Sequence, residues 1–127
     1  MIEEHLALLT KDICSRYPYF HFMVKYGDED YNVIGVGFGR VTLVKPFMSY
    51  TSGSPLIEEV KPYLRPMDTM TEQEREEYLA ECDKDDDTLT GQVYHGAEYL
   101  EKKMFDFRGL ITIGLALPAK EGMYKYV

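Results

Sequence analysis

The chain has 127 residues, of which 45% are hydrophobic and 13% aromatic, and its formal net charge is −8. This size and composition predict one folded domain over residues 1–127 with a single hydrophobic core, and they exclude an intrinsically disordered chain. No apolar run approaches the ~18 residues of a membrane helix. Glu3 and Glu4 stand where a secretory signal would carry basic residues. A cytoplasmic protein with no membrane partner is therefore expected.

The negative charge is concentrated in the middle of the chain. Residues 1–50 contain five Lys/Arg and six Asp/Glu (−1), residues 51–90 contain four and twelve (−8), and residues 91–127 contain five and four (+1). An acidic field of this kind repels nucleic acid and anionic lipid. The expected partner is therefore another protein or a second copy of the chain, and nucleic acid is not expected.

Residues 1–50 are predicted to form a helix followed by an antiparallel sheet. Apolar side chains recur every three or four residues on one face of a helix over about 2–16, namely Ile2, Leu6, Leu9, Ile13 and Tyr17. Strands are predicted at 19–26, 31–38 and 40–48 from their aromatic and β-branched content. The short connections between them favour a three-stranded meander.

The stretch GVGFGR, residues 35–40, is similar to a phosphate-binding glycine loop but lacks its essential features. An arginine stands where the last glycine of that motif belongs, and no helix is predicted to follow. We interpret the stretch as a strand with Ile34, Val36 and Phe38 on one face. After Gly39 the apolar positions shift by one, which predicts a bulge or a tight bend.

Residues 60–66, VKPYLRP, are interpreted as a rigid corner between the sheet and the next helix, because two prolines restrict the residues before them. Tyr63 and Leu64 are expected to anchor the corner in the core, and Arg65 to pair with nearby acids. The alternative is that Arg65 is presented as a binding residue. A short helical turn is expected just before the corner.

A helix over about 72–82 is predicted to begin with a capping box formed by Thr71 and Glu74. The acidic stretch DKDDD follows it, and it lacks the glycine and the bidentate glutamate of a calcium-binding loop. A solvated loop is favoured, and a weak divalent-cation site is the alternative. The carboxylates of that alternative site would be Asp83, Asp85 and Asp87.

The last third of the chain is predicted to begin with a helix over about 91–104, which a loop at 105–109 ends. The segment LITIGLAL, residues 110–117, fits either a strand or a short helix. The remaining tail is expected to be a loosely held extension.

No catalytic, metal-binding or cofactor-binding constellation is recognised in the sequence. The three histidines lie on different predicted elements, and the acids cluster where they would be solvated, which makes a carboxylate a poor general acid. We therefore expect no enzymatic activity and no cofactor. The candidates for contact with a ligand or partner are Arg65, Tyr94, His95, Asp106 and Arg108. Asp106 and Arg108 are expected to form an ion pair that closes the 105–109 loop.

Three stretches, KDICSRYPY, VKPYLRPMDTMTEQEREEY and FDFRGLITIGLALPAKEGMY, span most of the chain in this order. They resemble KDLCARLPYG, KPYLRPMSSMTEEE and HHFDYRGLIEKGLALEAPEGMY, which are typical of a family of small Bacteroidetes proteins often found in prophage-like or other mobile elements. This chain departs from that pattern at Lys103-Met104, where the family often has two histidines, and at Thr112-Ile113, where it has Glu-Lys. The resemblance implies that RGLITIGLAL is a short helix. It implies no activity.

Together these features predict an α+β fold, with an N-terminal helix packed on a small antiparallel three-stranded sheet, then a proline corner and two or three helices. The favoured function is a non-enzymatic accessory or protein-interaction protein of a mobile element, acting through its acidic surface. One alternative is a small-ligand-binding protein or enzyme with a pocket near Asp106 and Arg108. A second is an acidic nucleic-acid mimic that inhibits a DNA-binding partner.

Overall fold

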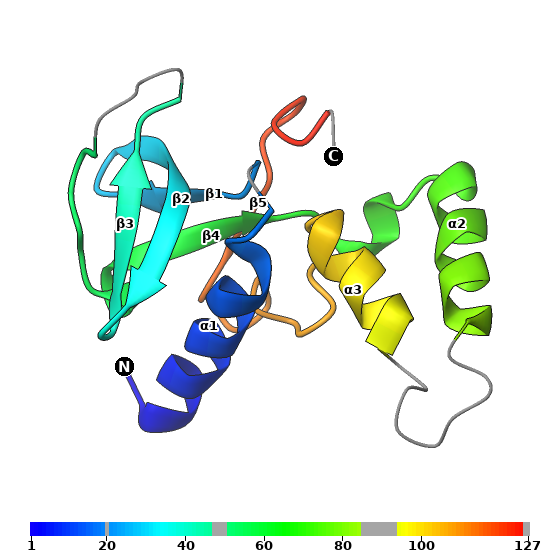
Figure 1. The fold of residues 1–127 in the computed structure, drawn as a ribbon, viewed down its shortest axis with the longest axis horizontal. Coiled ribbons are helices and arrows are strands. Elements are labelled where there is room, and N and C mark those ends of the chain that lie inside the picture. Colours follow the sequence, from blue (N-terminus) through cyan, green and yellow to red (C-terminus); the bar gives the residue numbers. More distant parts are fainter. Residues whose placement is uncertain (20, 47–50, 85–93, 126–127) are drawn as a thin grey trace.

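The computed structural model describes residues 1–19, 21–46, 51–84 and 94–125, and its fold is α+β, as predicted (Figure 1). The helices are α1 (Glu3–Arg16), α2 (Glu72–Asp83) and α3 (Tyr94–Lys102), with short 3₁₀ helices η1 (Ile57–Glu59) and η2 (Met67–Thr69). The strands are β1 (Met23–Tyr26), β2 (Glu29–Gly37), β3 (Arg40–Val44), β4 (Val60–Leu64) and β5 (Leu117–Pro118). No helix in the described ranges is long and apolar enough to cross a bilayer.

The sheet has five strands in the order β3-β2-β1-β4-β5, rather than the three that were predicted. The predicted meander is present as β1, β2 and β3, and β4 extends it antiparallel beside β1. β5 then pairs with β4 in parallel. The proline corner is therefore a strand in its first half. Pro62 is tolerated there because β5 pairs only from Tyr63 onwards, so Pro62 has a strand neighbour on one side only.

A bulge in β2 changes which of its side chains face the core. The register with β3 shifts between Val33 and Gly35, so Val33 is buried and Ile34 is 54% exposed. The predicted apolar face of Ile34, Val36 and Phe38 was therefore wrong. The bend predicted after Gly39 is present as the turn into β3, whereas the bulge lies earlier in the strand.

The turn between β2 and β3 holds an exposed aromatic side chain in a strained backbone. Gly37 pairs with Arg40, and the two residues between them both have positive φ, +53° at Phe38 and +73° at Gly39. Asparagine and glycine suit such a turn, whereas a residue like phenylalanine costs about 1–3 kcal/mol in this region. Phe38 is also fully exposed. We call residues 37–40 the hairpin tip.

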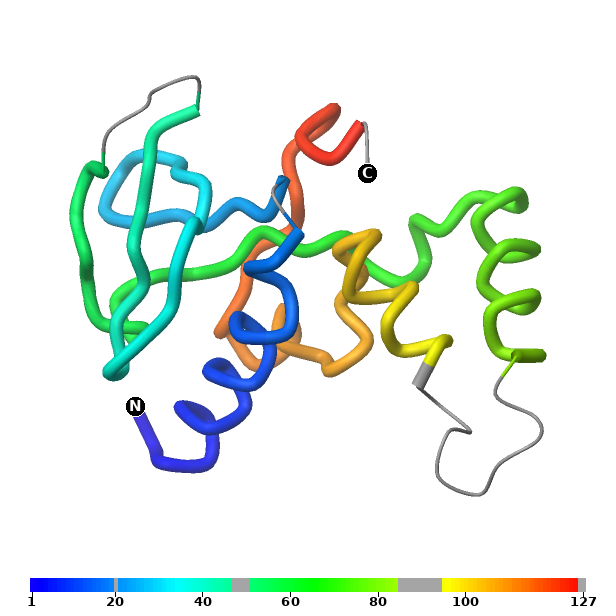
Figure 2. The backbone as a smooth tube through the Cα atoms, viewed as in Figure 1, coloured from blue at the N-terminus to red at the C-terminus, as the bar shows by residue number. Residues whose placement is uncertain are grey.

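The hydrophobic core is built from residues of α1 and of the sheet, which Figure 2 shows side by side. Leu9 and Ile13 of α1 are completely buried in it. The predicted helical periodicity of α1 and its packing on the sheet are thus confirmed. Tyr63 and Leu64 of β4 are also buried, as expected.

The helices α2 and α3 pack on each other at the end of the molecule away from β3 (Figure 1). The predicted capping box is confirmed, since Thr71 accepts from the Glu74 amide and Glu74 accepts from the Thr71 amide. No residue of α2 is buried. Its inner face contacts α3 at Gly96, where an added Cβ would lie 2.9 Å from the Sγ atom of Cys82. α2 is thus a surface helix, as predicted.

The segment over residues 109–125 differs from the predictions made for it, a strand or short helix at 110–117 and a loosely held tail. Turns occupy 110–116, and only Leu117–Pro118 is a strand. Gly109 and Gly114 have φ of +75° and +81°, which is incompatible with a continuous right-handed helix, so the short helix implied by the resemblance was wrong. The tail is also firmly held, because Tyr124 is only 7% exposed.

Candidate functional site

The four predicted contact residues whose side chains are described, Arg65, His95, Asp106 and Arg108, do not assemble into one site. Arg65 follows β4, and His95 lies in α3. Tyr94 is the first residue of α3, and its side chain is not among those that the structure describes. Asp106 and Arg108 follow α3 and point to different partners, as shown below.

Arg65 ties the start of α2 to the end of β4. Its guanidinium donates to both carboxylate oxygens of Glu74, each at 2.7 Å, and lies 4.2 Å from the centre of the Phe105 ring. The backbone of Arg65 also bonds on both sides, to the Met104 carbonyl and from the Asp106 amide. A bidentate, partly buried pair of this kind fixes the direction of the chain. The expectation that Arg65 pairs with nearby acids is confirmed.

We expect acid to weaken this connection. The Arg65 hydrogen bonds hold the pKa of Glu74 at about 2, below its ordinary value of 4.5. A lowered pKa contributes stability that is present above pH 4.5 and is lost as the pH falls toward 2. Urea unfolding of the wild type should therefore lose more free energy between pH 5 and pH 2 than unfolding of Glu74→Gln. Glu72→Gln, an exposed neighbour, should behave like the wild type, and an unchanged pH slope in Glu74→Gln would contradict the assignment.

Four charged side chains form a network that joins α1 to α3 and to the loop that follows α3. Asp12 and Arg16, both 0% exposed, pair within the helix at 3.0 Å. Arg108 donates to Asp12 at 2.7 Å and to Glu101 at 2.6 Å. Arg16 also donates to the Phe105 carbonyl at 2.6 Å. Two positive and two negative charges therefore balance, and no buried side-chain polar atom in the described part of the chain lacks a hydrogen-bond partner.

Asp106 serves the backbone rather than Arg108. Its carboxylate accepts hydrogen bonds from the amides of Leu110 and Ile111, at 2.8 and 3.0 Å. The predicted ion pair between Asp106 and Arg108 was therefore wrong. The acid orders the turn after residue 106, while the arginine reaches α1 and α3. Arg108 joins the third stretch of the resemblance to the first through Asp12, and the backbone amide of Asp106 joins the third stretch to the second through the Arg65 carbonyl.

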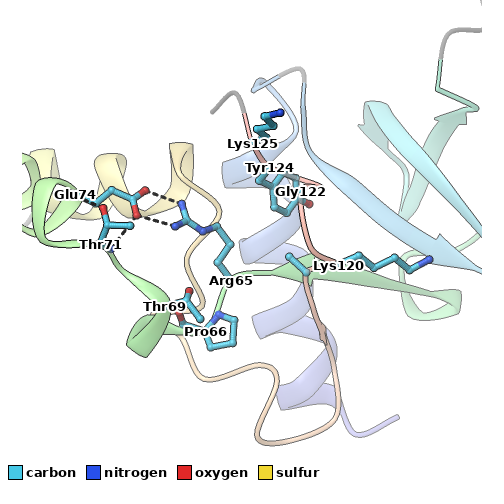
Figure 3. Close-up of a pocket in the computed structure, with 10 residues that line it drawn as sticks. Arg65, Pro66, Thr69, Thr71, Glu74, Lys120, Gly122, Tyr124 and Lys125 are labelled. Atoms are coloured by element: carbon cyan, nitrogen blue, oxygen red, sulfur yellow. Dashed lines mark hydrogen bonds and ion pairs between the residues drawn. The ribbon is translucent and has the colours of Figure 1, made fainter.

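A pocket of about 450 Å³ lies between the start of α2 and the C-terminal segment (Figure 3). It is lined by Arg65, Pro66, Thr69, Thr71, Glu74, Ala119, Lys120, Gly122, Tyr124 and Lys125. Figure 3 shows Arg65 directed at Glu74, away from the opposite wall. The Arg65 hydrogen bonds hold the pKa of Glu74 at about 2, so near neutral pH this side chain is ionised and is a weak base. The two threonine hydroxyls already bond to backbone atoms.

His95 lines a smaller hollow of about 270 Å³ on the α2–α3 pair, together with Glu81, Glu98, Tyr99 and Lys102. Its Nδ1 atom lies 3.9 Å from the Glu98 carboxylate. Neither hollow is lined by Asp106 or Arg108.

The aspartates proposed for a weak cation site are only partly described. Asp83 ends α2 and is exposed, whereas Asp85 and Asp87 lie outside the described residues. Within the described ranges, no group of three or more His, Cys, Asp or Glu side chains is placed to hold a metal ion.

The outer face of α2 carries a row of exposed side chains, Glu72, Glu76, Leu79 and Asp83. Their spacing of four, three and four residues aligns them along one side of the helix. We call this row the α2 stripe. The whole helix has six carboxylates and one arginine. The stripe presents acids on either side of Leu79, which is 51% exposed.

Sequence reasoning missed the buried network and the exposed hairpin tip. The i,i+4 spacing of Asp12 and Arg16 in the sequence signals an ion pair, but on a predicted helix this pattern normally faces water. The signal for the tip is the alternation of glycines at positions 35, 37 and 39 around Phe38, a pattern that also fits one face of a strand. Comparison of the chain with protein-family models, curated proteins and solved structures found no match.

Proposed function

We propose that this protein is a non-enzymatic, cytoplasmic protein-interaction protein, accessory to a mobile element, that binds its partner through the α2 stripe. The observation that carries the proposal is a twelve-residue helix with no buried residue and an acidic, exposed outer face. A helix that contributes so little to the core is available to a partner. The association with mobile elements rests on the resemblance of the three sequence stretches alone.

The charges and the apolar centre of the stripe favour a basic partner surface. Carboxylates at the edge of an interface steer an oppositely charged partner and add salt dependence, whereas the half-exposed Leu79 offers area for burial. The ligand-pocket alternative is less well supported. Asp106 is engaged with backbone amides, and Arg108 with Asp12 and Glu101, so both side chains already have protein partners.

Affinity capture from the native host tests the proposal. The tagged wild type should retain a defined partner that moderate salt releases, and Glu76→Lys with Asp83→Lys should lose it. The matched control is Asp28→Lys with Glu121→Lys, which makes the same change of charge at two exposed acids outside α2 and should retain the partner. Loss of the partner in both double variants would indicate that only net charge matters and would contradict a site on the stripe. A captured DNA-binding protein that releases its DNA would instead support the nucleic-acid mimic.

A further inference from the structure

Arg65 uses only part of its guanidinium in contacts with the protein. Nη1 and Nη2 both bond to Glu74, and Nη1 also donates to the Lys103 carbonyl. The Nε–H and the second hydrogen of Nη2 form the remaining edge of the group. In the described part of the chain, neither of these two hydrogens has an acceptor. Two adjacent N–H donors on one arginine are therefore left for a ligand.

This edge of Arg65 borders the pocket of about 450 Å³ between the start of α2 and the C-terminal segment. In Figure 3 the edge is turned toward Thr69 and Pro66, which also line the pocket, whereas the end of the guanidinium meets Glu74. A cavity of this volume lies within the range of about 300–1,000 Å³ that is usual for small-molecule sites. The two donors thus face a space that is large enough for a small ligand.

The guanidinium is also fixed in position before any ligand binds. The pair with Glu74 is bidentate, and the Phe105 ring lies 4.2 Å from the guanidinium centre. The side chain is only 19% exposed. A side chain that is already immobilised loses little entropy on binding, which favours binding to this arginine over binding to a mobile surface arginine.

The geometry and the charges around the edge select the chemical class of the ligand. Two parallel N–H donors match the two oxygens of a planar carboxylate. Glu74 is ionised and shares the same guanidinium, so it repels a phosphate dianion more strongly than a singly charged carboxylate. Lys125 lies across the pocket and offsets part of this repulsion.

We propose that this pocket binds a small organic acid, whose carboxylate accepts from the Nε–H and the Nη2–H of Arg65. The apolar part of the acid lies against Pro66, Ala119 and Tyr124, which form the apolar walls of the pocket. Arg65 then has two roles, since one edge ties α2 to β4 and the other holds the ligand. The inference goes beyond the proposed function, because no residue of the α2 stripe lines this pocket.

NMR titration of the ¹⁵N-labelled protein with benzoate tests the site, because the Arg65 Nε–H gives its own resonance. Benzoate carries one carboxylate on an apolar ring. We expect a saturable shift of this resonance with a Kd of about 1 mM. Benzamide, which has the same shape without the charge, should bind at least tenfold more weakly. Inorganic phosphate should also bind more weakly, because Glu74 repels it.

Variants on both sides of the contact make the test specific. Arg65→Lys keeps the charge but lacks the two parallel donors, so benzoate binding should fall at least tenfold. Thr69→Glu leaves Arg65 and its pair with Glu74 in place and adds a carboxylate beside the open edge, which should also block benzoate. Thr51→Glu makes the same change at an exposed threonine outside the pocket and should bind like the wild type. Circular dichroism should show that all three variants are folded.

Three results would overturn the inference. The first is an Arg65 Nε–H resonance that does not move in about 20 mM benzoate, which is well above the expected Kd. The second is equal affinity for benzoate and benzamide, or tighter binding of phosphate than of benzoate, since either excludes selection of a carboxylate. The third is equal binding by Thr69→Glu and Thr51→Glu, which would place the ligand elsewhere. None of these results bears on the α2 stripe, which the host capture experiment tests separately.

Discussion

Replacement of Asp12 by asparagine should lower the free energy of unfolding by about 3–5 kcal/mol, because it leaves two buried or nearly buried arginines with one carboxylate fewer. Asp12 is completely buried and accepts from both Arg16 and Arg108. Asparagine has the same shape, so the loss isolates the charge rather than the packing. Urea unfolding monitored by circular dichroism gives the change directly.

Two further variants make this prediction specific. Asp28→Asn, at an exposed aspartate, should change the stability by less than about 0.5 kcal/mol. Arg108→Met combined with Asp12→Asn should cost less than the sum of the two single changes, because the pair interacts directly. Additive effects, or a cost below 1 kcal/mol for Asp12→Asn, would show that the network is not an energetic centre of the fold.

Replacement of Tyr124 by alanine should cost about 3–5 kcal/mol, as for other large buried aromatic residues. The Tyr124 hydroxyl donates to the Tyr63 carbonyl at 2.8 Å and accepts from the Met23 amide at 3.0 Å. Burial raises the pKa of this hydroxyl, so it remains protonated and available as a donor. The side chain therefore fastens the C-terminal segment to β1 and β4, and its loss should release both contacts.

The ring and the hydroxyl of Tyr124 can be separated by a second substitution. Tyr124→Phe keeps the buried ring and should cost about 1–3 kcal/mol, because a buried carbonyl and amide lose their partner. Tyr26→Ala, at a tyrosine that is 38% exposed, serves as the control and should cost clearly less than Tyr124→Ala. Equal unfolding free energies for Tyr124→Ala and the wild type would contradict this prediction and would support the loosely held tail predicted from the sequence.

Local sequence patterns were sufficient for the elements whose stability is local. The periodicity of α1, the meander from β1 to β3 and the Thr71–Glu74 capping box all follow from residues within a few positions of one another. The tight bend after Gly39 was predicted, whereas the bulge between Val33 and Gly35 was not. A single extra residue there exchanges the two faces of the strand, so the pattern of alternation after it predicted the wrong side for Ile34.

The contacts that could not be predicted from the sequence are those that join segments far apart in the chain. Arg108 lies 96 residues from Asp12, and nothing in either local sequence identifies the partner. Its two nearest candidate partners in sequence were Asp106 and Glu101, of which only Glu101 is bonded to it. The strand β4 was obscured by Pro62, because proline is rare inside sheets. β4 can contain Pro62 because β5 is too short to pair with it, and the residues of β5, Leu117–Pro118, lie about 50 residues later in the sequence.

The pairing of the first helix with the last third of the chain has a consequence for how the protein is made. At a synthesis rate of about 5–20 residues per second, Asp12 is translated some 5–20 s before Arg108. Met23 waits still longer for Tyr124, which lies 101 residues away. During that interval the apolar face of α1 and the meander has no complete core to cover it. The nascent domain is therefore expected to fold late, only after Tyr124 has been translated, and to present its first 50 residues to chaperones until then.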